Sequence, residues 1–163
     1  MDQYKAQPGA FKQAQMLAMY EDGVNLTGRK KFKEAIARFT EALALDPAFV
    51  ESYIARGNAE TELRMHAEAL ADFNKAIALD PGLKEARDYL YVFRDMSVCH
   101  TALKQWDAVV QDSNTMIHMY AKYPWPYMSR SIAYAALGKV EESKADDLMF
   151  EKLKAEFEKP AKL

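Results

Sequence analysis

Small and apolar residues recur along this chain at spacings that place them on one face of a helix. The recurring unit is a glycine, an alanine twelve positions later, a phenylalanine after four more and a proline after another eight. It occurs twice, 34 residues apart, as Gly23, Ala35, Phe39 and Pro47 and again as Gly57, Ala69, Phe73 and Pro81. The small residues let two antiparallel helices approach closely, and the proline cannot continue the second helix. The pattern predicts an all-α chain built from helix pairs.

The second half of the chain returns to the same register after one insertion. Tyr53, Arg56 and Leu63 recur 74 residues later as Tyr127, Arg130 and Leu137. Because 74 is 34 plus 40, six extra residues enter around 84–89, before the third pair. We expect a flexible leader at 1–10, a single array over 11–163 and a tail at 158–163. The expected repeats are 16–49, 50–83, 90–123 and 124–157. The expected helices are 11–27, 31–45, 50–64, 67–79, 83–103, 106–121, 125–137 and 140–158.

With these spacings the chain resembles the tetratricopeptide repeat (TPR) family, whose 34-residue unit carries small residues, an aromatic residue and a closing proline at the same places. The resemblance implies a right-handed α-α superhelix of four helix-turn-helix pairs with a long C-terminal helix. It also implies a concave peptide-binding groove lined by the first helix of each pair. The positions that carry over as groove residues are Leu17, Tyr20, Val24, Ile54, Asn58, Tyr91, Arg94, Val98, Trp125, Met128 and Ile132.

The implied lining differs from that of TPR co-chaperones, which hold a C-terminal carboxylate with lysine, asparagine and arginine side chains. In this chain those positions are occupied by Tyr20, Val24, Ala55, Tyr91 and Asp95. The chain is therefore predicted not to bind an Hsp70 or Hsp90 C-terminal tail. An apolar or amphipathic segment, held by several apolar anchors, suits the lining better.

Composition excludes several classes of function. The 163 residues include 22 Lys and Arg against 24 Asp and Glu, a net charge of −2 that gives no general attraction to nucleic acid or to anionic membrane. The single cysteine, Cys99, excludes an intrachain disulfide, and no apolar run approaches the ~20 residues that span a bilayer. We expect a cytoplasmic protein without membrane insertion, metal or cofactor.

Residues with reactive side chains are better explained by packing than by catalysis. Cys99 and His100 are neighbours on a helix, so their side chains point about 100° apart and cannot readily hydrogen-bond each other. His66 and His118 show no metal-ligand spacing with His100. The basic run 29–33 falls in a turn between helices, where solvated charge is ordinary, and binding of an acidic partner there is the weaker interpretation. We expect no enzyme activity.

One charge pattern is tested by the repeats themselves. Residues sixteen apart change sign together in three repeats, as Asp22 with Arg38, Arg56 with Asp72 and Arg130 with Asp146. We predict a cross-helix ion pair in each of these repeats. The third repeat has Met96 opposite Asp112, which leaves Asp112 for a different partner.

The sequence favours a protein–protein interaction adaptor or scaffold that binds a partner peptide in the concave groove. Two alternatives stay open. One is self-association as a homodimer through Leu148, Met149, Leu153 and Phe157 of the last helix. The other is an export or secretion chaperone that holds a hydrophobic segment, a role that a family of similar repeat proteins performs.

Overall fold

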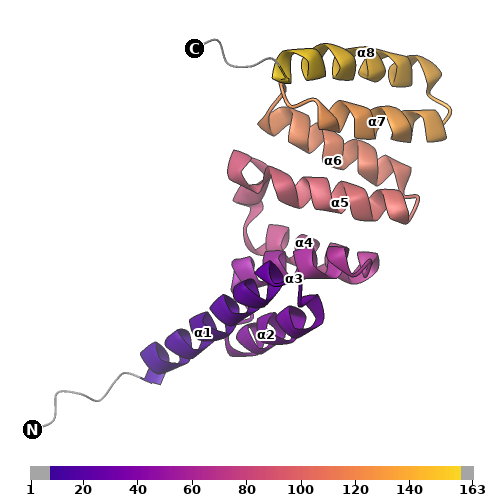
Figure 1. The fold of residues 1–163 in the computed structure, drawn as a ribbon. Coiled ribbons are helices and arrows are strands. Elements are labelled where there is room, and N and C mark those ends of the chain that lie inside the picture. Colours follow the sequence, from indigo (N-terminus) through magenta and orange to yellow (C-terminus); the bar gives the residue numbers. More distant parts are fainter. Residues whose placement is uncertain (1–7, 159–163) are drawn as a thin grey trace, which may run out of the picture. The chain divides into compact units, whose positions relative to one another are not determined.

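The computed structural model describes residues 8–158, which form eight α-helices and two short 3-10 helices with no strand (Figure 1). The first four helices are α1 (Pro8–Gly28), α2 (Phe32–Leu45), α3 (Val50–Glu62) and α4 (His66–Leu79). Two 3-10 helices follow, η1 (Pro81–Lys84) and η2 (Arg87–Tyr89). The last four helices are α5 (Leu90–Ala102), α6 (Trp106–Met119), α7 (Trp125–Ala136) and α8 (Val140–Phe157). The all-α prediction and the helix pairing are confirmed.

The chain divides into two compact units, the first ending at Asp80 and the second beginning at Pro81. In the first unit α1 packs on α2, α2 on α3, and α3 on α4. In the second unit α5 packs on α6, α6 on α7, and α7 on α8, and Figure 1 shows these four helices side by side in chain order. Each unit is therefore two helix pairs that share a continuous apolar core.

The predicted start of the fifth helix is wrong, whereas that of the first lies within the expected boundary margin of about two to four residues. Helix α1 begins at Pro8, inside the expected leader, while residues 1–7 lie outside the described part of the chain. The helix expected from residue 83 begins only at Leu90. Pro81 cannot extend α4 and Gly82 is a weak helix former, and Leu83 is buried in the core, which holds this segment as η1.

In the first unit each pair closes by setting a glycine against a phenylalanine. A Cβ built on Gly57 would lie 2.8 Å from Cε1 of Phe73, and one built on Gly23 would lie 2.5 Å from Cε1 of Phe39. The second unit fills the same register differently. Ser97 and Ser113 are both buried there, and in the last pair the Ser131 hydroxyl hydrogen-bonds Asp147. In the second unit these two positions therefore carry small or polar side chains in place of glycine and phenylalanine.

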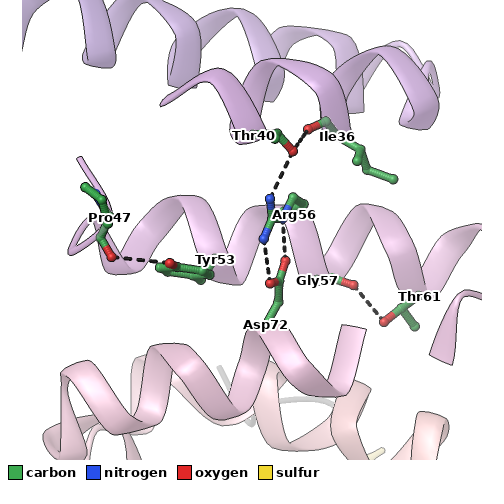
Figure 2. A network of polar contacts seen from close by, with 8 residues as sticks. All are labelled: Ile36, Thr40, Pro47, Tyr53, Arg56, Gly57, Thr61 and Asp72. Carbon is green, nitrogen blue, oxygen red and sulfur yellow. Dashed lines mark hydrogen bonds and ion pairs between the residues drawn. The ribbon is translucent and has the colours of Figure 1, made fainter. Parts of the chain in front are cut away.

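All three predicted ion pairs are present. The distances from arginine Nε to the Asp carboxylate oxygen are 2.7 Å for Arg38–Asp22, 2.6 Å for Arg56–Asp72 and 2.7 Å for Arg130–Asp146. The latter two pairs are largely buried, and each arginine also bonds the preceding helix. Figure 2 shows Arg56 of α3 reaching Asp72 of α4 and Thr40 of α2. Arg130 likewise donates to Asn114 of α6. These arginines fix the register of three helices at once.

In the third repeat the aspartate, Asp112, has its hydrogen-bond partner at a different position of the first helix. His100 lies one helical turn beyond Met96, and its Nδ1 is 2.6 Å from Oδ2 of Asp112. Burial raises the pKa of Asp112, and the hydrogen bond from His100 opposes that rise. The aspartate left over in the sequence thus has a histidine as its partner.

Glu60 occupies the place in α3 that His100 has in α5, but it is a second acid beside Asp72. The pKa of Glu60 is raised to about 7, chiefly by burial and then by the Asp72 carboxylate, while the Arg56 guanidinium opposes the rise. Because the folded state holds the Glu60 proton more tightly than the unfolded chain, Glu60 lowers the free energy of unfolding as pH rises from about 4.5 through 7.

We therefore expect Glu60→Gln to stabilise the chain at pH 8 by about 1–3 kcal/mol and to have little effect at pH 5. Urea unfolding followed by circular dichroism at both pH values measures the difference. The exposed Glu62→Gln variant is the matched control and should change neither value. An equal gain at both pH values would show that Glu60 acts through packing and not through its charge.

Candidate functional site

Helix α5 buries one side and exposes another. Val92, Phe93, Met96 and Cys99 face the core, which leaves Arg94 and Val98 on the outside of the helix. The side chain of Val98 is 50% exposed. Arg94 is exposed as well and lies 2.9 Å from the carboxylate of its neighbour Asp95. Tyr91 is half-buried, with its ring 6.3 Å from that of Tyr89.

Helix α7 repeats this arrangement one repeat later. Tyr127, Ser131 and Ala133 face inward, while Ile132, which stands 34 residues after Val98, is also 50% exposed. Met128 lies one turn before Ile132 and is half-buried. Trp125 is partly exposed at the start of the helix, and its ring packs 5.5 Å from Phe150 of α8.

Helices α5 and α7 contact each other, so these outward side chains lie on neighbouring helices of one unit. We call Val98, Trp125, Met128 and Ile132 the α5–α7 face. Large aliphatic side chains left half in water on adjacent helices are typical of a protein-binding surface. Arg94 and Asp95 stand beside this face on α5 as a mutually neutralised pair.

In the first unit fewer of the predicted groove residues are accessible to solvent. Leu17 and Val24 are exposed on α1, but Tyr20 is half-buried, with its ring 5.9 Å from Phe39 and 5.1 Å from Phe49. Ile54 is only 3% exposed, so it belongs to the core and cannot line an accessible groove. Asn58 is half-buried, and its Oδ1 has no hydrogen-bond partner within the described residues. Register alone could not separate Ile54 from Arg94, its exposed counterpart in the third repeat, because both occupy equivalent helix positions.

Within residues 8–158, Cys99 and the two histidines described next are buried or already have partners. Cys99 is fully buried, and the Nδ1 of His100 is engaged by Asp112. His118 lies 3.1 Å from Glu85 at the surface. Among residues 8–158, no group of three or more His, Cys, Asp or Glu side chains is placed to hold a metal ion. Nor is any described helix long and apolar enough to cross a membrane.

The basic turn between α1 and α2 surrounds a shallow depression. Lys30, Lys31 and Lys33 line it together with Phe32 and Leu63. The Nζ of Lys31 is 3.1 Å from Glu34, so part of this charge is neutralised locally. The turn provides a comparison surface for binding experiments, because it is cationic where the α5–α7 face is apolar.

A family model described as "Tetratricopeptide repeat" matches residues 50–83, the range expected for the second repeat. This segment is a tetratricopeptide repeat. No curated protein matches it in sequence.

Solved TPR structures share the fold at low sequence identity. "Crystal structure of MamA" is 16% identical with a TM-score of 0.77, covering 86% of this chain and 79% of that one. MamA from Desulfovibrio magneticus RS-1 is 10% identical with a TM-score of 0.77, covering 88% and 78%. The first TPR of Spaghetti (RPAP3), solved with the HSP90 peptide SRMEEVD, is 21% identical with a TM-score of 0.67, covering 77% and 95%. At these identities the likeness shows the TPR fold.

Proposed function

We propose that this chain is a non-catalytic adaptor that binds an apolar or amphipathic segment of a partner protein on the α5–α7 face. The observation that carries the proposal is the half-exposed pair Val98 and Ile132, which stand at the same register position on two contacting helices. TPR arrays are interaction modules, and the buried Cys99 gives no access to a nucleophile.

An amphipathic helix is the ligand that this face suits. Its apolar side chains, spaced by three and four residues, would cover Val98, Met128 and Ile132, while its polar side stays in water. Trp125 at one edge adds an aromatic side chain of the kind that dominates binding energy. Because the contact is apolar, its affinity should be nearly independent of salt, since screening acts on charge.

An acidic C-terminal tail suits the face poorly. The RPAP3 repeat was solved with the HSP90 peptide SRMEEVD, whose carboxylates require cationic partners. On α5 the corresponding positions carry Tyr91 and Asp95, and Asp95 already pairs with Arg94. We therefore expect SRMEEVD to show no saturable binding by isothermal titration calorimetry at peptide concentrations up to about 1 mM, a weaker interaction than about −4 kcal/mol.

The test is a double substitution, Val98→Glu with Ile132→Glu, in the full chain. Two carboxylates placed on the α5–α7 face should weaken binding of an amphipathic partner segment at least about 30-fold, equivalent to about 2 kcal/mol. Proteins that the wild-type chain retains from lysate are first identified, and the segment of each that binds is made as a peptide. The affinity of each peptide is then measured by calorimetry at low and physiological salt.

Two controls separate this face from the rest of the chain. Leu103→Glu with Val140→Glu adds the same charge at comparably exposed apolar residues near helix ends and should leave the affinity unchanged. Lys30→Glu with Lys31→Glu reverses the basic turn and should also change little. Loss of binding in the turn variant, with indifference in the Val98 and Ile132 variant, would move the site to the turn and overturn the proposal.

A further inference from the structure

Helix α8 carries different residue types from α2, α4 and α6 at three equivalent positions on one side of the helix. Helices α2, α4 and α6 carry aliphatic residues at two positions seven apart, Ile36 and Leu43, Leu70 and Ile77, and Val110 and Ile117. The equivalent residues of α8 are Lys144 and Glu151, both exposed. Between them, where the other helices have Thr40, Asn74 and Asn114, α8 has Leu148. Apolar and polar positions have thus been exchanged.

In the first and third repeats this side of the second helix is an interface. Helix α2 packs on α3, and Thr40 accepts a hydrogen bond from Arg56. Helix α6 packs on α7 in the same way, with Asn114 accepting from Arg130. Leu148 stands at the position of Thr40 and Asn114 but is 75% exposed. We call Lys144, Leu148 and Glu151 the α8 outer face.

We propose that the α8 outer face pairs with the same face of a second copy of this chain, with the two helices antiparallel about a two-fold axis. The midpoint of Lys144 and Glu151 falls between residues 147 and 148, so Leu148 of one copy lies beside the axis and beside Leu148 of the other. Lys144 of each copy then faces Glu151 of its partner, because the two residues are equally far from the axis. The pairing gives two intermolecular ion pairs around an apolar centre.

The charges argue for a second copy and against an unrelated apolar helix. Lys144 lies 3.0 Å from Glu141 on its own helix, so it keeps an opposite charge in any pairing. An all-apolar partner would cover Glu151, however, and leave that carboxylate without an opposite charge, which is costly. The face is instead complementary to itself, as a two-fold interface requires. Ala145 stands beside Lys144 on the helix and is exposed, and its small side chain allows the two helices to approach.

This pairing replaces the contact set expected from the sequence. Leu153 is only 8% exposed and is part of the core, so it cannot contact another molecule. Phe157 packs against Tyr123 with ring centroids 6.3 Å apart. Met149 lies on the flank of the helix, next to Leu148. Of the four predicted residues, Leu148 stands at the centre of the proposed interface.

Sedimentation velocity of the full chain over a hundredfold concentration range tests the proposal. We expect wild-type protein to shift from monomer to dimer as concentration rises. Leu148→Glu should be monomeric throughout, and Lys144→Glu or Glu151→Lys alone should raise the dimer dissociation constant at least tenfold. The double variant Lys144→Glu with Glu151→Lys restores both ion pairs with reversed polarity and should return the constant to within threefold of wild type.

Two results would overturn the proposal. One is a wild-type chain that stays monomeric at the highest concentration. The other is a dimer whose dissociation constant is unchanged by the single charge reversals or is not restored by the double variant. In both cases the contact between copies would lie elsewhere on the chain. Thermal melts check folding, and Lys122→Glu, an exposed lysine outside α8, controls for net charge. The peptide-binding proposal uses Val98 and Ile132, so failure of one proposal leaves the other standing.

Discussion

Gly57→Leu is expected to destabilise the first unit by more than about 3 kcal/mol, because a large side chain must overpack a site that is already closed. Even the Cβ of the new residue would lie 2.8 Å from Cε1 of Phe73, whose ring is fully buried. Urea unfolding followed by far-ultraviolet circular dichroism measures the loss. The same change at Gly23 should be at least as severe, since its Cβ would lie 2.5 Å from Phe39.

Gly28→Leu is the matched control. Gly28 is also in a helix, but a Cβ there meets nothing within 4 Å. The Gly28→Leu substitution should therefore change the free energy of unfolding by less than about 1 kcal/mol. A second check uses Phe73→Ala, which alone should cost about 3–5 kcal/mol. Combined with Gly57→Leu it should cost less than the sum, because the leucine enters the space that the ring has left. Strict additivity would contradict the close contact.

Arg56→Met should have the next largest effect, a loss of about 3–5 kcal/mol. The substitution keeps an apolar stem of similar length but leaves Asp72 buried without its cation. Glu60 lies beside Asp72 and adds a second carboxyl to the same site. The hydrogen bond to Thr40 on α2 is lost as well, so the contact between the two helix pairs of the first unit loosens (Figure 2). Urea unfolding at pH 7 measures the change.

Arg38→Met is the control with the same chemistry in a different environment. Its partner Asp22 is 2.7 Å away, but the two side chains are 41% and 49% exposed, against 20% and 9% for Arg56 and Asp72. Exposed ion pairs contribute little to stability because water screens them, so this variant should be close to wild type. Equal losses in both variants would mean that burial does not decide the strength of these pairs.

The repeat register could be found from the sequence because it is marked by residues at close helix contacts, where few other residue types fit. Glycine at 23 and 57 and phenylalanine at 39 and 73 fix how closely two helices pack. The ion pairs could be found for a related reason. An arginine and an aspartate that exchange places together between repeats, as in Asp22–Arg38 and Arg56–Asp72, indicate contact across a helix pair.

Accessibility within a register could not be predicted in the same way. Ile54 and Arg94 occupy the same place on the first helices of their repeats, yet Ile54 is in the core and Arg94 is exposed. On α8, Leu148 is 75% exposed and Leu153 only 8%. A sequence position sets the direction of a side chain from its own helix, whereas its exposure depends on which neighbouring helix covers that side.

The sequence by itself therefore determined the all-α fold, the helix pairs and the three arginine–aspartate contacts, because the repeat spacing records which positions of two paired helices face each other. Only the tertiary structure decided the partner of Asp112, the burial of Glu60 and the break between Pro81 and Leu90. The same is true of the apolar residues that remain at the surface. Each of these depends on atoms brought together from separate helices, and that proximity exists only once the helices have packed.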